Sequence, residues 1–169
     1  MRRHLFEGVI RKPLTEPAPV TDDAATAELA ASLDRTARKR LGHSLSIRAV
    51  DAGSCNGCEL EIIALNNAFY DLERLGLRFV ASPRHADVLL VTGPVTKNMR
   101  EALQRTYHAT PDPKWVVALG DCAVDGGLFA GSPACIGAVS TVVPVDIHIR
   151  GCPPSPRKIL ASLLAMLEI

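Results

Sequence analysis

Residues 53–61 of this chain read GSCNGCELE, and the interpretation of the sequence starts from the two cysteines in this stretch. Cys55 and Cys58 are separated by two residues, so their thiolates can hold one metal centre, and glycine lets the backbone wrap around it. The pair alone is compatible with a redox dithiol, with half of a zinc site or with half of an iron–sulfur site. The positions of the other cysteines therefore have to distinguish these three kinds of site.

Composition restricts the class of protein. The chain has 169 residues, of which 47% are hydrophobic, and this suits one globular unit with a substantial core. A formal net charge of +1 gives no argument for binding to nucleic acid. No apolar run is long enough to span a bilayer, and the Arg2–Arg3 pair lacks the apolar segment that follows it in an export signal. We therefore expect a cytoplasmic protein whose five cysteines are metal or redox ligands rather than disulfides.

The chain is expected to divide into an N-terminal arm with a docking helix, residues 1–43, and an α/β domain, residues 44–169. Residues 1–20 are proline-rich without periodicity, whereas residues 24–40 have the spacing of a helix that Asp22 or Asp23 caps. Four basic residues near the end of this helix suit its dipole, namely Arg35, Arg38, Lys39 and Arg40. They are compatible with a solvated face, or with docking onto a partner subunit or an anionic membrane surface.

Patterns typical of strands and helices alternate along the rest of the chain. We expect strands near residues 45–49, 77–80, 88–91, 115–119 and 145–149. We expect helices over residues 58–75 and 97–108, and a closing helix with Ser155 as its cap and Pro156 at its first position. The run at residues 88–91 is continuously apolar, as in a strand covered on both faces. This alternation predicts a parallel α/β sheet.

The other cysteines follow predicted strands. Cys55 comes after the first strand, Cys122 after the strand at residues 115–119, and Cys152 after the last strand. In a parallel sheet the carboxyl ends of the strands lie along one edge, where ligands bind. We therefore expect the thiols of Cys55, Cys58, Cys122 and Cys152 to meet at that edge.

Three glycines and one glutamate complete the predicted site. Gly57, Gly120 and Gly151 lie on the cysteine loops, where small residues let backbone N–H groups approach the sulfur atoms of a cluster. Glu61 lies one helical turn after the second cysteine of the pair, which suits a role beside the cluster and equally a carboxylate favoured by the helix dipole. Glu59 is expected to be exposed.

The spacing of the cysteines favours a 4Fe–4S cluster. Zinc sites usually combine two compact pairs, whereas here one pair joins two widely separated single cysteines. The Cys152–Pro153 dipeptide also resembles the Cys-Pro of bacterial ferredoxins. A zinc-stabilised interaction module and a dithiol redox enzyme stay open as less favoured alternatives. Cys135 lies beside apolar residues, away from any predicted strand end, and we expect it to be a small buried hydrophobe rather than a ligand.

Five ordered motifs resemble those of a known family. They are CNGCELE at residues 55–61, SPRHADVLL at 82–90, TGPVTKNM at 92–99, GDCAVDGG at 120–127 and VPVDIHIRGCPPSP at 143–156. Over about residues 45–168, the chain resembles the small electron-transfer subunit of membrane-bound, energy-converting NiFe hydrogenases, such as the formate hydrogenlyase type. Complex I shares this subunit, as its B subunit.

The resemblance implies a flavodoxin-like α/β fold, with helices on both faces of a parallel sheet and one 4Fe–4S cluster at the C-terminal edge of the strands. It gives the ligand role to Cys55, Cys58, Cys122 and Cys152, and leaves Cys135 outside. It implies that this chain has no catalytic residue and relays electrons as one subunit of an oxidoreductase complex. The implied partners are a hydrogenase-type large subunit, a ferredoxin-like iron–sulfur subunit and membrane subunits, at the inner face of the cytoplasmic membrane.

The spacing of the first two cysteines separates two branches of this resemblance. Complex I B subunits usually have two adjacent cysteines here, whereas this chain has the C-x-x-C form of the hydrogenases. We therefore expect electron relay to or from the NiFe active site of a hydrogenase large subunit. The alternative is a B-type subunit of a complex I-like NADH:quinone oxidoreductase that passes electrons to quinone.

Overall fold

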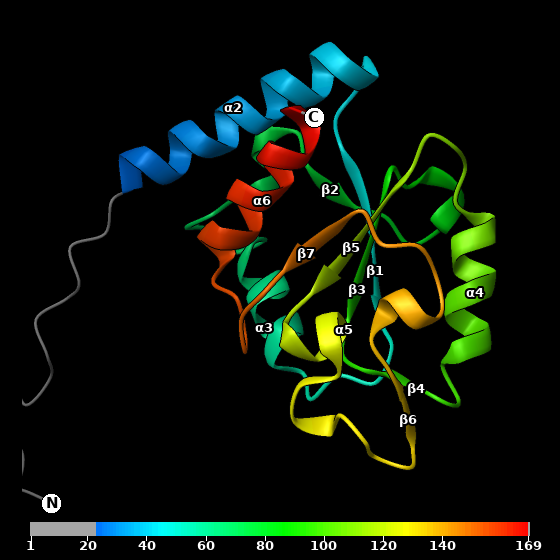
Figure 1. Ribbon diagram of the computed structural model, residues 1–169. Coiled ribbons are helices and arrows are strands. Elements are labelled where there is room, and N and C mark those ends of the chain that lie inside the picture. The colour runs from blue at the N-terminus through cyan, green and yellow to red at the C-terminus, as the bar shows by residue number, and fades with distance from the viewer. Residues whose placement is uncertain (1–22, 169) are drawn as a thin grey trace, which may run out of the picture.

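The computed structural model describes residues 23–168, and its centre is a five-stranded parallel sheet (Figure 1). The strands lie in the order β2-β1-β3-β5-β7. Their bounds are Ser46–Asp51 for β1, Arg78–Phe79 for β2, Val88–Thr92 for β3, Trp115–Leu119 for β5 and Ile147–Ile149 for β7. Counted along the chain, this is the 2-1-3-4-5 order of flavodoxin-like sheets, so the predicted fold is confirmed.

The register of the sheet brings the carboxyl ends of its strands level with one another. Asp51, the last residue of β1, pairs with Thr92, the last residue of β3. Thr92 pairs in turn with Leu119 of β5, and Leu119 pairs with Ile149 of β7. The loops after these four strands therefore leave the sheet along one edge. The strand order reverses at β1, where the crevice beside β3 is the usual ligand position in such sheets.

Helices cover both faces of the sheet (Figure 1). On one face lie α2 (Asp23–Leu41), α3 (Gly57–Ala64) and α6 (Pro156–Glu168), and on the other lie α4 (Arg100–Ala109) and α5 (Asp121–Asp125). All residues of β3 are buried, and they alternate between the two cores. Val88 and Leu90 belong to the core that α6 covers, whereas Leu89 and Val91 belong to the core that α4 covers. The prediction of a strand covered on both faces is confirmed.

α2 packs against α6 at one side of the sheet. Leu33 and Ala37 are fully buried, and Arg40 Nη1 donates a hydrogen bond of 2.8 Å to the carbonyl oxygen of Leu167. The Arg40 guanidinium also lies 5.3 Å from the centre of the Trp115 ring, within the range of a cation–π interaction. The helix predicted over residues 24–40 is confirmed, whereas the arm predicted at residues 1–20 and the proposed cap at position 22 lie outside the described residues.

The helix predicted over residues 58–75 is wrong in length, because α3 ends at Ala64. Asn67 interrupts the pattern, since its Oδ1 accepts hydrogen bonds of 2.9 and 3.0 Å from the backbone N–H groups of Phe69 and the next residue. Such an Asx turn competes with the helical hydrogen bonds. The Phe69 side chain is consequently 51% exposed rather than part of a buried helix face.

A closing helix, a second small sheet and short 3₁₀ helices complete the described part of the chain. α6 begins at Pro156, and Ser155 Oγ accepts a hydrogen bond of 3.4 Å from the Lys158 N–H, so the predicted cap is confirmed. A small antiparallel sheet joins β4 (Val95–Thr96) to β6 (Cys135–Gly137). Short 3₁₀ helices lie at Leu72–Leu75, Pro83–His85, Gly127–Phe129 and Val139–Thr141. Across residues 23–168, no helix is both long and apolar enough to cross a membrane.

Candidate metal centre

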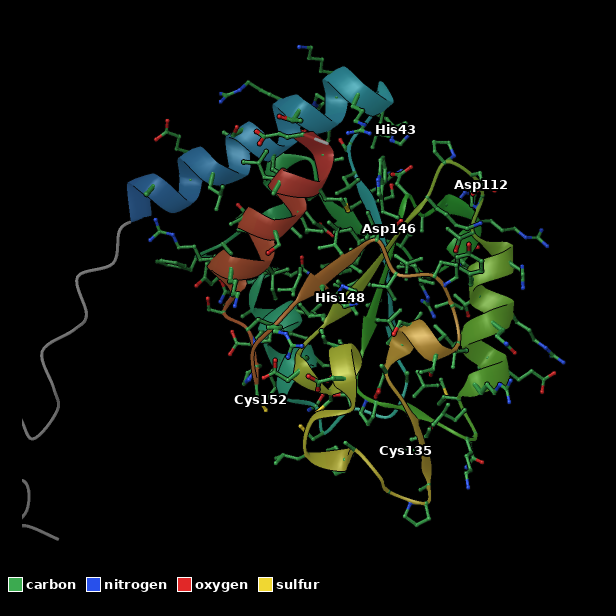
Figure 2. All side chains as sticks on the ribbon, viewed as in Figure 1. His43, Asp112, Cys135, Asp146, His148 and Cys152 are labelled. Atoms are coloured by element: carbon green, nitrogen blue, oxygen red, sulfur yellow. The ribbon has the colours of Figure 1, made fainter. Side chains whose placement is uncertain are left out.

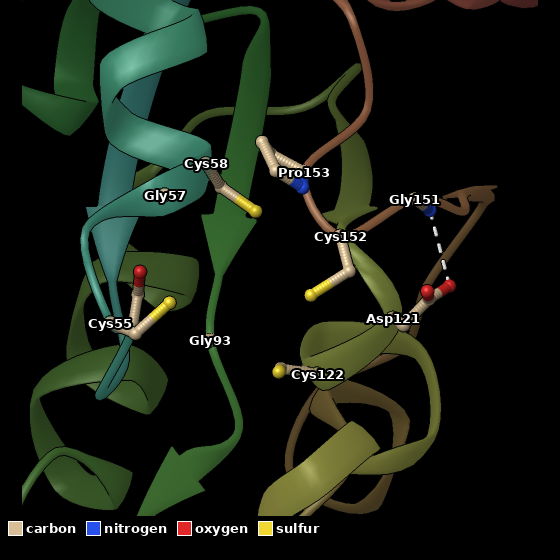
Figure 3. Close-up of a pocket in the computed structure, with 10 residues that line it drawn as sticks. Cys55, Gly57, Cys58, Gly93, Asp121, Cys122, Gly151, Cys152 and Pro153 are labelled. Carbon is tan, nitrogen blue, oxygen red and sulfur yellow. Dashed lines mark hydrogen bonds between the residues drawn. The ribbon is translucent and has the colours of Figure 1, made fainter.

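Four thiols line one cavity at the carboxyl edge of the sheet (Figure 3). They belong to Cys55, Cys58, Cys122 and Cys152, and their sulfur atoms point toward a common space. The cavity has a volume of about 110 Å³, and its wall is mainly apolar. The structure thus brings together the four cysteines that the sequence predicted to converge.

Each of these cysteines is positioned by the segment that follows a strand. Cys55 lies in the loop after β1, and Cys58 lies in the first turn of α3. Cys122 is the second residue of α5, and Cys152 lies in the loop after β7. Between the first two, Asn56 has a φ of 73°, a left-handed conformation that asparagine adopts more readily than most residues. This residue lets the chain turn directly from the loop into α3.

Backbone hydrogen bonds join the two loops that carry single cysteines. The N–H of Gly120 donates to the carbonyl oxygen of Ile149 at 2.8 Å, and the N–H of Asp121 donates to that of Gly151 at 2.9 Å. The N–H of Gly151 in turn donates to Asp121 Oδ1 at 3.1 Å (Figure 3). A cysteine follows next on each loop, so the protein itself fixes how these two thiols lie relative to each other.

Two glycines leave room for the thiols. Gly120 has a φ of 90°, and a Cβ atom there would lie 2.6 Å from the Cys58 sulfur. Gly127 has a φ of 47°, and a Cβ atom there would lie 2.9 Å from the Cys122 sulfur. Both positions therefore require glycine for space as well as for backbone conformation. Gly127 is missing from the predicted site residues, although the Gly-Gly pair shortly after Cys122 was a visible signal.

Two of the four thiols in the cavity have a raised pKa, and burial is the largest cause in both. Burial, the charge of Glu59 and the three other thiols raise the pKa of Cys58 to about 12. Burial and the neighbouring Cys152 also raise the pKa of Cys122, although a hydrogen bond from the backbone N–H of Leu128 opposes this shift. Four thiolates would repel one another here unless a cation compensated their charge. The cavity therefore has the electrostatic character of a site where metal binding displaces protons from cysteine.

The spacing of the donors distinguishes a single ion from a larger group. Within the described residues, no group of three or more His, Cys, Asp or Glu side chains is close enough to hold one metal ion. A zinc ion bound at about 2.3 Å by each thiolate would bring the sulfur atoms within about 4 Å of one another. The four thiols line a cavity of about 110 Å³, and such a space could hold a group larger than one ion, such as an iron–sulfur cluster in which each thiolate would bind a different iron atom.

Glu59 is not exposed, contrary to the prediction. Its side chain is half-buried, and its Oε2 accepts a hydrogen bond of 2.5 Å from Ser54 Oγ. Its Oε1 accepts a short hydrogen bond from Thr92 Oγ1. The prediction was wrong because Thr92 comes close to this loop only through the pairing of β1 with β3, which no local sequence pattern reveals.

The other predicted site residues differ in their relation to the cavity. Gly57 and Gly151 line it, and Gly120 adjoins one of its sulfur atoms. Glu61 is half-buried and does not line the cavity. Cys135 lies on β6, outside the cavity (Figure 2).

Fold and site together define a flavodoxin-like α/β protein with a thiol-lined cavity at the edge of its sheet. Within that class, the family described as "NADH ubiquinone oxidoreductase, 20 Kd subunit" matches residues 55–166, and the chain belongs to this family. The matched range contains all four cysteines of the cavity. The family resemblance carried by the five motifs is confirmed.

Relatives of this chain are subunits of oxidoreductase complexes. The chain is 47% identical over 130 residues to the "Probable membrane-bound hydrogenase subunit mbhJ" of Pyrococcus furiosus, over 77% of this chain and 78% of that protein. It is 43% identical over 155 residues to formate hydrogenlyase subunit 7 of Escherichia coli, over 90% of this chain but only 59% of that protein. A solved structure of the membrane-bound sulfane sulfur reductase, an archaeal respiratory membrane complex, contains a similar chain with a TM-score of 0.66 and 33% identity. That similarity covers 88% of this chain and 75% of the other.

Proposed function

We propose that this chain carries one 4Fe–4S cluster, held by Cys55, Cys58, Cys122 and Cys152, and relays electrons as a subunit of a membrane-bound hydrogenase complex. One observation carries the proposal: cysteines from the segments that follow three different strands line a single cavity at the carboxyl edge of the sheet. When bound, such a cluster supplies one-electron redox chemistry. The residues of this chain hold it, shield it on the sheet side and leave its other side open to a partner.

The exposure of the cysteines supports electron transfer through one side of the site. Cys55 and Cys152 are exposed, whereas Cys58 and Cys122 are half-buried. Leu128, whose backbone N–H donates a hydrogen bond to Cys122, is 89% exposed. The adjoining Phe129 is 40% exposed, and contiguous exposed apolar side chains beside a redox site suit a surface that a partner subunit covers. A hydrogenase-type large subunit docked there would bring its NiFe centre close to the thiols.

The sequence and the relatives support the hydrogenase branch. The two-residue spacer between Cys55 and Cys58 is the form typical of hydrogenases. One relative is named a membrane-bound hydrogenase subunit and another a formate hydrogenlyase subunit. The proposal therefore extends to a hydrogenase-type large subunit, a ferredoxin-like iron–sulfur subunit and membrane subunits as partners. In such a complex the chain is peripheral, lies at the cytoplasmic face of the membrane and makes no bond to substrate.

A B-type subunit of a complex I-like quinone reductase is the second candidate, favoured by the name of the family that matches residues 55–166. Both candidates require the same cluster, so the partner large subunit discriminates between them. Two C-x-x-C pairs in that subunit would provide nickel ligands and support the hydrogenase. Their absence would favour quinone reduction or another reaction, such as the one for which the sulfane sulfur reductase complex is named.

The cluster and its ligands are tested with two cysteine variants. The full-length chain, purified without oxygen, is expected to contain about four iron atoms and to give an EPR signal on reduction. Cys122→Ser is expected to lose most of this iron, because it removes one of the four thiolates. Cys135→Ser is expected to retain it and serves as the matched control, since Cys135 lies outside the cavity.

Two results would contradict the proposal. Stoichiometric zinc without iron in the wild-type chain would indicate a zinc-stabilised interaction module instead of an electron relay. Equal iron loss in Cys122→Ser and Cys135→Ser would show that the ligand set is wrong.

A further inference from the structure

The carboxylate of Glu59 has two hydrogen-bond partners. The proposed role of the four cysteines as cluster ligands does not explain these contacts. Oε2 accepts a bond of 2.5 Å from Ser54 Oγ, and Oε1 accepts a short bond from Thr92 Oγ1. Within the described part of the chain, no cation forms an ion pair with Glu59. Two neutral hydroxyl groups therefore hold a half-buried carboxylate, and hydrogen bonds to such a charged acceptor are stronger than those to neutral groups.

These hydrogen bonds join both ends of the two-cysteine loop to the neighbouring strand. Glu59 directly follows Cys58, and Ser54 directly precedes Cys55. Thr92 ends β3, which pairs with β1 in the crevice where the strand order reverses. The carboxylate thus connects the first turn of α3 to the start of the loop and to β3.

Other hydrogen bonds fix the beginning and the middle of this loop. The Asn56 N–H, between the two cysteines, donates to Ser54 Oγ at 3.0 Å. Asp51 Oδ1 accepts hydrogen bonds from the N–H groups of Gly53 at 2.8 Å and Ser54 at 2.7 Å. The Ala52 N–H donates to the carbonyl oxygen of Thr92 at 3.0 Å. These contacts hold the loop from β1 to its middle, whereas Glu59 adds the connection from its far end, at α3, back to β3.

A helix-dipole role does not account for the contacts of Glu59. A carboxylate in the first turn of a helix is favoured by the dipole whether or not it is hydrogen-bonded, and Glu59 occupies the first turn of α3. The dipole requires neither hydroxyl partner. Glu61, two residues later in the same helix, has no such side-chain hydrogen bond among the described residues.

We propose that Glu59 is a positioning residue of the cluster site, which fastens the Cys55–Cys58 loop to the end of β3 and keeps a negative charge beside Cys58. This inference rests on the proposed function. A fixed negative charge next to a cluster opposes the addition of an electron, so Glu59 lowers the reduction potential of the relay. The same contacts keep the loop closed over its side of the cluster and slow the loss of iron.

Glu59→Gln is the informative variant, and Glu61→Gln is its matched control on the same helix. Both remove one negative charge close to Cys58, but only position 59 is bonded to the two hydroxyl groups. In the full-length chain with its cluster, we expect Glu59→Gln to raise the reduction potential clearly more than Glu61→Gln does, as measured by EPR during a redox titration. We also expect Glu59→Gln to release iron to a chelator up to about tenfold faster than the wild type.

Thr92→Val separates the tether from the charge. Valine has nearly the shape of threonine but lacks the hydroxyl group, and the charge of Glu59 remains in place. We expect faster iron release than in the wild type, with a smaller change in reduction potential than in Glu59→Gln. If Glu59→Gln assembles no cluster, iron release from Thr92→Val still tests whether this hydrogen bond holds the loop.

Several outcomes would overturn the inference. A wild-type reduction potential and wild-type iron release in Glu59→Gln would refute the role of Glu59 without contradicting the proposed cluster. Equal shifts of the reduction potential in Glu59→Gln and Glu61→Gln would show that any lost negative charge near Cys58 has this effect, without a specific role for Glu59. If Glu59→Gln assembled no cluster, unchanged iron release in Thr92→Val would refute the tether. A wild-type chain without iron would defeat the proposed function and this inference together.

Discussion

The folded chain opposes ionisation of the Cys58 thiol, chiefly through burial. Its thiol is half-buried, and burial, Glu59 and the three other thiols raise its pKa to about 12. A metal requires the thiolate, so metal binding at neutral pH has to displace a proton from this side chain. The burial that disfavours the free thiolate would also shield a bound cluster from water.

The stability of the metal-free chain is expected to fall as the pH rises from 9 toward 12. The Cys58 thiol has its ordinary pKa of 9.0 in the unfolded chain and a pKa of about 12 in the folded chain. Within this window the unfolded state has lost a proton that the folded state retains, so rising pH favours unfolding. Below the window both states hold the proton, and this contribution to stability is fully present. Urea unfolding of the metal-free chain at a series of pH values measures the effect.

Cys58→Ala provides the comparison for this pH dependence. Without the thiol, the fall in stability should be shallower than in the wild type, whereas Cys135→Ala should leave it unchanged. A Cys58→Ala variant whose stability fell as steeply as that of the wild type would assign the effect to other groups.

Individual residues were predictable from the sequence when their role depended on a local pattern. The spacing of Cys55 and Cys58, and the position of Cys122 after a strand, pointed to one site because parallel strands end at one edge. Glu59 was not predictable, because its partner Thr92 lies on another strand and reaches it through the sheet register.

At the scale of elements, Arg150 links the loop after β7 to α5. Its Nη1 lies 2.8 Å from Asp125 Oδ2 and 3.8 Å from Asp121 Oδ1, and the hydrogen bond lowers the pKa of Asp125. Cys122 lies in α5, and Cys152 comes just after Arg150. We therefore expect Arg150→Gln to release iron from the proposed cluster faster than the wild type, because the two segments separate more easily.

Arg105→Gln is a control for the loss of an exposed ion pair. Arg105 Nη2 lies 2.5 Å from Glu101 Oε1 on α4. Exposed ion pairs contribute little to stability, so both variants are expected to unfold close to the urea midpoint of the wild type. Iron release to a chelator should rise only in Arg150→Gln, by at most about fivefold. Wild-type release in both variants would show that the backbone hydrogen bonds between the loops suffice.

The strands were more predictable than the helix ends. β3 and β5 were visible as continuous apolar runs, because both of their faces are covered. The end of α3 was not visible, because the interruption depends on the side-chain hydrogen bonds of Asn67. α5 has five residues, which is too short for a hydrophobic period to appear in the sequence.

At the scale of the whole molecule, topology rather than local structure determines the site. Alternating strands and helices predicted a parallel sheet, and such a sheet implies a common edge for the cysteine loops. The volume of the cavity and the exposure of Cys55 and Cys152 on its open side depend on how the loops pack against each other. These properties could therefore not be derived from the spacing of residues along the chain.

The role of α2 is the remaining question at this scale, because the predicted division after residue 43 assigns this helix to a docking segment. Leu33 is fully buried in the core that also contains Leu160 and Leu163 of α6. If α2 is part of the folded domain, Leu33→Ala should lower the free energy of unfolding by about 2–5 kcal/mol through lost burial and a cavity, as measured by urea denaturation. Leu128→Ala, at a side chain that is 89% exposed, should change it by less than about 0.5 kcal/mol. Equally small effects in both variants would instead support an independent docking helix.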